Sequence, residues 1–337
     1  MKRPSVKYLT DKFRLNFKQV RNLISTLVCI ISWKWKICKY IAPAPLILMV
    51  EPTNRCNFRC PLCDRGVGKL KRAEGDLSLE RFCQLIDMTG GRLKMLLLWN
   101  QGEPLLNRHI TEFIEYAKER SIFCVVSTNG SLLESKGKEL IDAGLDELIV
   151  SLDGASPETF ALYRQGGDFR KIVSSVKDLT VYRGKKSKPL ISLQFLLLKH
   201  NIGEMGEFKR LGEELGADRI LWKTAQAGSN QEAEEYLPEA GEFSRYKGYQ
   251  RLELKRKRSI CRRIFYSAVI DWNGNMTACC FDKDEDYVMG NVFEAGLEQV
   301  WRGQRFNEFR RDILQGKTPA MCGNCTEGLE RMFITEK

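Results

Sequence analysis

Short apolar runs alternate with longer amphipathic stretches along most of the chain. The runs have strand length and are apolar almost throughout, which is typical of parallel strands buried on both faces. The stretches between them have helical length and spacing. The expected strands lie at residues 46–50, 95–99, 123–127, 147–152, 191–197 and 219–222, and the expected helices at 78–88, 108–120, 132–143, 168–182 and 204–215. We therefore predict an α/β fold, a partial (βα)6 TIM-like barrel whose functional residues lie at the C-terminal ends of its strands.

An apolar stretch at residues 22–33 precedes the barrel and has basic residues on both sides. We predict an amphipathic N-terminal helix here. A bilayer span needs about 20 apolar residues, so the stretch is too short to cross a membrane. Two alternatives remain. The helix lies in the headgroup region of a membrane, with peripheral contact through residues 14–42, or it docks on the protein's own body.

The pattern divides the chain into four regions. The helical segment occupies residues 1–42, and the barrel occupies residues 43–223. Periodicity is lost at residues 224–257, which we interpret as a linker. Residues 258–330 form a small cysteine-rich unit that begins with an expected β-hairpin, whose turn is Asn273-Gly274.

Composition and charge narrow the class of protein. With 337 residues, 43% of them hydrophobic, the chain can bury a large core and a smaller unit. The chain has twelve cysteines and is too long for a small disulfide scaffold, and no small-residue cleavage site follows the apolar stretch. We therefore expect reduced thiols and a cytoplasmic location. Peripheral attachment to the inner face of the membrane is compatible with that expectation. Residues 1–42 hold ten Lys or Arg and one Asp, so the remainder carries only +2 of the net charge of +11. A nearly neutral body disfavours a nucleic-acid partner.

Three cysteines follow the first expected strand in a CxxxCxxC arrangement, namely Cys56, Cys60 and Cys63. A 4Fe-4S cluster that only carries electrons takes four thiolates, so a loop with three leaves one iron open to a small molecule. An open metal position indicates chemistry at the metal. The alternatives are a zinc site completed by a distant residue and three unrelated buried cysteines. The two histidines, His109 and His200, are isolated in the sequence and are assigned no role.

This loop resembles that of the radical S-adenosylmethionine (SAM) superfamily, in which three cysteines bind a 4Fe-4S cluster and SAM occupies the fourth iron. The segment from Gln101 to Pro104, after the second strand, is similar to the glycine-rich motif of that family. Two positions depart from the family pattern: Gln101 replaces a glycine, and Leu62 stands where many relatives have an aromatic residue.

Polar residues at the ends of later strands resemble the ribose and carboxylate contacts of the same family. Their Asn-Gly and Asp-Gly pairs are also common turn dipeptides, so each alone has a structural alternative. Taken together, the resemblance implies cluster ligands Cys56, Cys60 and Cys63. It implies SAM contacts at Gly102, Glu103, Pro104, Ser127, Asn129, Ser151, Asp153 and Gln194.

The later cysteines resemble the SPASM extension of radical SAM enzymes. Cys261 is followed by twelve residues and Gly274, then four residues and Cys279, and a CxxC pair, Cys322 and Cys325, closes the set. A full SPASM domain uses seven cysteines for two clusters, so the resemblance implies one auxiliary 4Fe-4S cluster on Cys261, Cys279, Cys322 and Cys325. Cys280 is an alternative ligand to Cys279, and a structural zinc is an alternative to the cluster. Cys83 and Cys124 are expected to be buried apolar residues.

The resemblance implies an enzyme that reductively cleaves SAM to a 5′-deoxyadenosyl radical, which takes a hydrogen atom from a substrate. Its electron would come from a reductase, a flavodoxin or a ferredoxin. Because the N-terminal helix suggests a membrane, a small molecule, lipid or saccharide is favoured over a peptide as substrate, and no catalytic base is identified. The alternatives are a peptide-modifying maturase of the same superfamily and a non-catalytic iron-sulfur electron carrier; an RNA-modifying member is disfavoured by the nearly neutral body.

Overall fold

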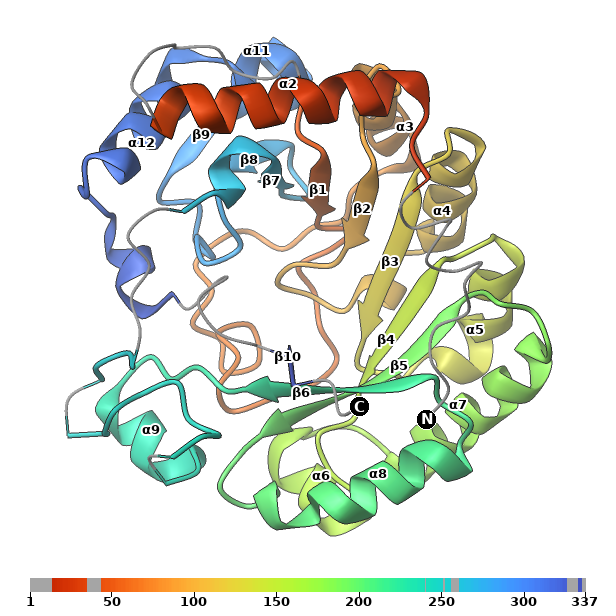
Figure 1. The fold of residues 1–337 in the computed structure, drawn as a ribbon. Coiled ribbons are helices and arrows are strands. Elements are labelled where there is room, and N and C mark those ends of the chain that lie inside the picture. Colours follow the sequence, from red (N-terminus) through yellow and green to blue (C-terminus); the bar gives the residue numbers. More distant parts are fainter. Residues whose placement is uncertain are drawn as a thin grey trace.

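One curved sheet with helices on its outer side forms most of the molecule (Figure 1). The computed structural model describes residues 14–34, 44–239, 241–250, 252–255, 261–325 and 333–334. The barrel strands are β1 (Ile47–Val50), β2 (Met95–Leu98), β3 (Phe123–Thr128), β4 (Glu147–Ser151), β5 (Leu190–Leu197) and β6 (Arg219–Thr224). They pair in parallel and in chain order. The predicted partial barrel is therefore confirmed.

Helices connect these strands. They are α3 (Leu79–Met88), α4 (Ile110–Glu119), α5 (Leu133–Asp142), α6 (Pro157–Tyr163), α7 (Phe169–Arg183) and α8 (Met205–Glu214), with short 3-10 turns η1 (Pro104–Leu106) and η2 (Ile202–Glu204). Side-chain caps fix several helix starts: Ser78 accepts from the N–H of Arg81 in α3, and Asp168 accepts from the N–H of Lys171 in α7. The helix α6 was not expected, since its seven residues are too few to show a helical period.

Both faces of the curved sheet are buried, but in different cores. One face packs against the helices, with Leu48 and Val126 among its residues. The other face forms a separate cluster of Phe123, Val125 and Leu190, against which Trp99 packs. Burial on both faces explains why the strand sequences are continuously apolar.

The C-terminal unit continues the same sheet. Strand β7 (Ser267–Ile270) pairs in parallel with β1, and β8 (Asn275–Thr277) and β9 (Val288–Asn291) follow as antiparallel neighbours. The predicted hairpin turn at Asn273-Gly274 is present, and Gly274 has a φ of +93°, a conformation that glycine adopts without strain. The unit also contains α10 (Val292–Ala295), α11 (Leu297–Trp301), α12 (Gln304–Leu314), η3 (Arg263–Phe265) and η4 (Ala320–Asn324).

The sheet has ten strands in the order β10-β6-β5-β4-β3-β2-β1-β7-β8-β9, where β10 (Phe333–Ile334) pairs antiparallel with β6. The segment interpreted as a linker contains helix α9 (Asn230–Tyr236) and packs against the end of β6, where Arg245 Nη2 donates to the Thr224 carbonyl at 2.6 Å. The boundaries of the four regions stay predictions.

The expected N-terminal helix is α2 (Phe17–Lys34), which lies across the starts of the first strands (Figure 1). Its side chains bond to carbonyl groups of Ala44 and Leu93, which precede β1 and β2. Within the described ranges, no helix is long and apolar enough to span a membrane. Residues 35–42 of the expected membrane-contact segment lie outside the described residues.

Candidate active site

The three-cysteine loop leaves the C-terminal end of β1 and is held by its own backbone and by buried aromatic residues. The N–H of Cys63 donates to the Cys60 carbonyl at 3.1 Å, and the N–H of Phe58 lies 3.5 Å from Cys56 Sγ. Cys60 is buried, and the other two thiols are half-buried. Burial raises the pKa of Cys60 to about 11, and the guanidinium of Arg164 opposes this rise. The loop thus presents three closely spaced thiols, a donor set that fits a cluster with one open iron.

Gly102 allows the end of β2 to pack directly on this loop. A Cβ at this position would lie 2.2 Å from the Thr53 carbonyl oxygen and 2.7 Å from that of Arg55. The next residue bonds to the same stretch, since the N–H of Glu103 donates to the Arg55 carbonyl at 2.8 Å. The geometric reason for glycine at Gly102 is therefore the approach of two backbone segments.

The Glu103 carboxylate lies in the interior and accepts three hydrogen bonds. Its Oε1 accepts from Thr128 Oγ1 at 2.6 Å and from the N–H of Leu105 at 3.1 Å, and its Oε2 accepts from the N–H of Asn129 at 2.7 Å. Burial raises the pKa of Glu103, and these bonds oppose the rise. The side chain also caps η1, which begins at Pro104. Glu103 therefore ties the end of β2 to the end of β3.

The remaining expected SAM contacts lie at the ends of β3 and β4 and, within β5, at Gln194, which pairs with Ser151. Asn129 Nδ2 lies 3.9 Å from Cys56 Sγ and donates to Asn57 Oδ1 at 2.9 Å, so this side chain adjoins the cysteine loop. Ser151 Oγ accepts from Gln194 Nε2 at 3.0 Å. Ser127 is half-buried near the end of β3. The structure thus places all of these residues along one end of the barrel.

Arg164 joins this group although the sequence did not indicate it. It directly follows α6, its Nε donates to Asp153 Oδ2 at 2.6 Å, and its Nη1 lies 3.7 Å from Cys60 Sγ. Asp153 is fully buried and also accepts from the N–H of Leu196 at 2.6 Å. Burial works against the charge of Arg164, but the Asp153 carboxylate outweighs it and raises the pKa of the guanidinium. Arg164 was missed because an arginine at a helix end is usually a solvated surface residue.

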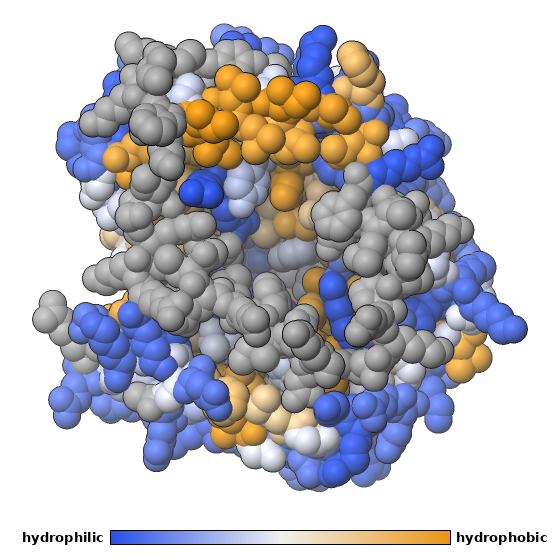
Figure 2. Space-filling view, in the orientation of Figure 1, coloured by the Kyte–Doolittle hydropathy of each residue, from blue (hydrophilic) through white to orange (hydrophobic). Residues whose placement is uncertain are grey.

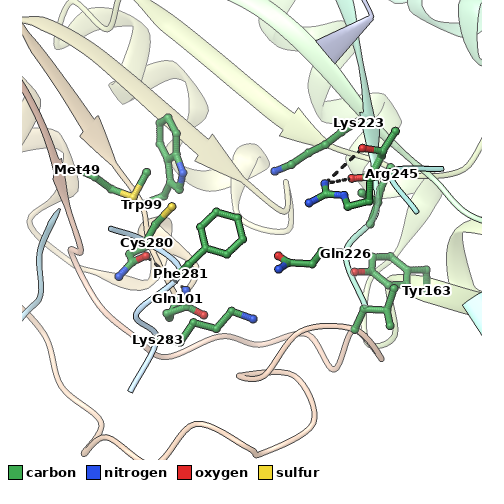
Figure 3. A pocket seen from close by; sticks show the side chains of 14 residues that line it. Met49, Trp99, Gln101, Tyr163, Lys223, Gln226, Arg245, Cys280, Phe281 and Lys283 are labelled. Atoms are coloured by element: carbon green, nitrogen blue, oxygen red, sulfur yellow. Dashed lines mark hydrogen bonds between the residues drawn. The ribbon is translucent and has the colours of Figure 1, made fainter. Parts of the chain in front are cut away.

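A cavity of about 300 Å³ opens beside the cysteine loop, between the barrel and the C-terminal unit. Figure 3 shows Trp99, Gln101 and Cys280 on one side of it and Lys223 and Arg245 on the other. Leu62 of the cysteine loop also contributes to the lining. Lys223, Arg245 and Lys283 contribute to the lining, and Lys283 Nζ is paired with Asp64 Oδ2 at 2.7 Å.

A buried ionic network supports the floor of this cavity. Arg72 Nη2 donates to Glu51 Oε1 at 2.8 Å, and its Nη1 lies 3.4 Å from Asp271 Oδ1 and 3.0 Å from Glu285 Oε1. Burial and the neighbouring Glu51 hold the pKa of Asp271 well above its ordinary value.

The network also holds the residues between β2 and Gly102. The N–H of Gln101 donates to Glu51 Oε1 at 3.1 Å, and Asn100 Nδ2 donates to Asp271 Oδ1 at 2.9 Å. Glu51 follows β1 and Asp271 follows β7, so the glycine-rich segment is fixed by both the barrel and the C-terminal unit.

Of the C-terminal cysteines, Cys261, Cys322 and Cys325 lie near one another, and Cys279 lies beside Cys280. Burial raises the pKa of Cys322 to about 11, with further contributions from the neighbouring Cys325 and Cys261. Cys279 forms a thiol hydrogen bond with Cys280, whose side chain belongs to the cavity lining. Across the described part of the chain, no three His, Cys, Asp or Glu side chains converge on one point as ligands of a single metal ion.

Two other cysteines were expected to be apolar fillers. Cys124 is fully buried on β3, where burial raises its pKa to about 12. Cys83 is half-buried on α3. Neither lies in the cavity lining.

Comparison with known proteins agrees with this site. The family model of the radical SAM superfamily matches residues 50–211, and the SPASM model, an iron-sulfur cluster-binding domain, matches residues 261–326. A tungsten-containing aldehyde ferredoxin oxidoreductase cofactor-modifying protein of Pyrococcus furiosus is 26% identical over 78% of this chain and 82% of its own. The mycofactocin maturase MftC of Mycobacterium ulcerans is 24% identical over 84% of this chain and 80% of its own. The PqqA peptide cyclase of Rhizobium meliloti is 28% identical over 54% of this chain and 48% of its own.

Solved structures share the fold. SuiB of Streptococcus suis bound to the precursor peptide SuiA superposes with a TM-score of 0.59 at 14% identity, covering 88% of this chain and 72% of SuiB. The three-thiol loop, the glycine-rich segment packed on it and the two family matches lead to one conclusion. This chain is a radical SAM enzyme and belongs to the radical SAM superfamily, with a C-terminal SPASM domain.

Proposed function

We propose that this enzyme modifies a peptide by taking a hydrogen atom from one of its residues. The observation that carries the proposal is the cavity beside the cysteine loop, whose volume of about 300 Å³ can hold one side chain of a peptide but not a whole lipid. Relatives named as a maturase and as a peptide cyclase support this assignment. The peptide-modifying alternative thus has better support than the small molecule, lipid or saccharide that the sequence analysis favoured.

The cysteine loop and the strand ends would divide the work of binding. Cys56, Cys60 and Cys63 would hold the cluster, which together with SAM supplies the radical that takes the hydrogen atom. Glu103 keeps lone pairs beyond its hydrogen bonds to Thr128, Leu105 and Asn129, and these would accept from the SAM amino group. Arg164 lies close enough to the loop to hold the SAM carboxylate. Leu62 and Trp99 would limit the access of water.

The basic side of the cavity would orient the substrate. Arg245 is 4% exposed and is fixed by its bonds to Thr224, so its guanidinium is pre-positioned. Lys223 extends from β6 into the same side (Figure 3). These two residues would therefore contact the substrate from one side of the cavity.

The remaining cofactor assignments follow the cysteine count. One auxiliary 4Fe-4S cluster, held by Cys261, Cys279, Cys322 and Cys325, is proposed for the SPASM domain. A reductase, flavodoxin or ferredoxin would supply the electron, and the cytoplasm provides the reduced thiols that cluster assembly needs.

The first test asks whether the protein cleaves SAM. After anaerobic reconstitution with iron and sulfide, we expect about eight irons per chain and dithionite-driven formation of 5′-deoxyadenosine. The Cys56→Ala variant should lose cleavage and about half of the iron, whereas the matched Cys83→Ala variant should keep both. Protein that holds its iron but does not cleave SAM would favour the electron-carrier alternative. About four irons per chain with SAM cleavage intact would indicate zinc in place of the auxiliary cluster.

The second test separates a peptide from a small molecule. Formation of 5′-deoxyadenosine is measured with a heated extract of the source organism, before and after treatment of that extract with a protease. A peptide substrate predicts stimulation that the protease removes. Stimulation that survives the protease would assign a small molecule instead.

A further inference from the structure

Helix α2 docks on the body through polar side chains. Gln19, Asn22 and Thr26 are buried. Gln19 Nε2 donates to the Leu93 carbonyl at 2.7 Å, and Asn22 Nδ2 donates to the Ala44 carbonyl at 3.0 Å. These bonds set the rotation of the helix about its own axis.

The opposite face of α2 is apolar and points to solvent. A surface helix normally turns its apolar face toward the core, whereas α2 turns three polar side chains and Cys29 there. Figure 2 shows the hydrophobic side chains of this helix as one continuous row on the surface. The exposed residues are Phe17 (80%), Val20 (38%), Ile24 (56%), Leu27 (50%), Val28 (50%) and Ile31 (56%).

No similar row is found elsewhere on the described surface. The other exposed large hydrophobic residues are scattered over the cysteine loop, η1, α6 and the end of α7, namely Val67, Leu106, Leu162, Val181 and Tyr182. Single exposed apolar side chains need no explanation, but a contiguous apolar patch marks an interaction surface.

Positive charge borders the apolar row. Arg14, Lys18 and Arg21 are exposed, and at three- to four-residue spacing they lie along one side of it. The sequence from residue 14 to residue 34 contains no Asp or Glu, and residues 1–42 hold +9 of the total charge of +11. An apolar face with a basic border is complementary to a membrane surface that carries anionic headgroups.

We propose that α2 lies flat in the headgroup region of an anionic bilayer, with Phe17, Ile24, Leu27, Val28 and Ile31 immersed. Its 18 residues give a contact about 27 Å long. A helix of this kind enters the bilayer by about 5–10 Å, which matches a single row of side chains. Pairing with a second copy is less favourable, because it would bring two strongly basic segments together.

The proposal does not depend on the proposed function. The bonds of α2 reach carbonyls that precede β1 and β2, whereas the cavity lies at the opposite, C-terminal ends of the strands. A bilayer on α2 would therefore leave the cavity facing the aqueous phase. The membrane helix thus gives no reason to expect a lipid substrate.

The test is co-sedimentation of the full chain with phosphatidylcholine vesicles, with and without phosphatidylglycerol. We expect the protein to bind the anionic vesicles and to bind vesicles of phosphatidylcholine alone at least about tenfold more weakly. The Ile24→Gln/Leu27→Gln variant should lose about tenfold in partition coefficient for each side chain changed. In the Lys18→Gln/Arg21→Gln variant, the partition coefficient should fall about fivefold for each charge removed, and only on anionic vesicles.

The matched control is Leu162→Gln/Val181→Gln, which removes two exposed apolar residues elsewhere and should bind as the unchanged protein does. Circular dichroism and thermal unfolding verify that each variant is folded, as expected for exposed positions. Equal binding by the α2 variant and the unchanged protein would overturn the proposal, as would the absence of binding. A dimer in analytical ultracentrifugation that the Ile24→Gln/Leu27→Gln change dissociates, without vesicle binding, would assign the face to self-association instead.

Discussion

At the scale of single residues, the cysteine loop and the glycine-rich segment depend on contacts that leave no space. Gly102 is the clearest case, because a Cβ there would meet the backbone of Thr53 and Arg55 at 2.2 and 2.7 Å. Neither atom belongs to a flexible side chain, so the loop itself would have to move.

We expect Gly102→Ala to lower the free energy of unfolding by about 1–3 kcal/mol, as overpacking does, and to weaken SAM binding by about tenfold or more. Chemical denaturation and equilibrium dialysis with labelled SAM measure the two effects. Gly206→Ala is the control, because a Cβ there has no neighbour within 4 Å and alanine favours the helix. Equal SAM affinity in both variants would contradict this account.

The sequence identified individual site residues only where a motif marked them. The cysteine spacing and Gly102 carry such a mark. Arg164 and Arg72 do not, because each acts through carboxylates that the fold brings near: Asp153 in one case, Glu51 and Asp271 in the other. A pair of this kind becomes visible only when the strand ends are placed in space.

At the scale of elements, one arginine connects the segment after the cysteine loop with the C-terminal hairpin. Arg72 and its partners Glu51 and Asp271 are almost fully buried. Removal of this cation would leave buried carboxylates without a counter-charge, which is far more costly than the loss of an exposed ion pair.

Arg72→Met should lower the free energy of unfolding by about 3–5 kcal/mol. Arg210→Met is the control, because it removes an ion pair with Glu207 whose side chains are 68% and 55% exposed. Its free energy of unfolding should change by less than about 1 kcal/mol. Urea denaturation of both variants measures the difference. Similar losses in the two would mean that the network does not support the fold.

Elements with a clear period were predictable, and short ones were not. All six barrel strands and five of the helices between them lie where the apolar pattern places them. Helices α6 and α9, of seven residues each, are fixed by caps at Ser156 and Ser229, not by a long apolar stripe.

At the scale of the whole molecule, the barrel and the SPASM domain are not two separate bodies with a linker between them. Strand β7 pairs with β1 along its length, from Ile47 opposite Ser267 to Val50 opposite Ile270. The sequence gives no sign of this pairing, since its partners are more than 200 residues apart and nothing local specifies which edge β7 joins.

A shared sheet predicts that β1 and β7 open together. Hydrogen exchange followed by mass spectrometry should give residues 47–50 and 267–270 similar opening free energies, and residues 230–236 of α9 a lower one. Much faster exchange in β7 than in β1 would indicate that the C-terminal unit unfolds on its own.

The order of strands also bears on how the protein avoids aggregation. The two edges of the ten-stranded sheet are β9, with four residues, and β10, with two. The ladder between β8 and β9 is interrupted by a register shift at Met276 and Thr277. Long, flat edges recruit strands from other chains, and short or irregular ones do not. Another copy could therefore extend the sheet at β9 by only a few backbone hydrogen bonds, which disfavours the growth of fibrils from that edge.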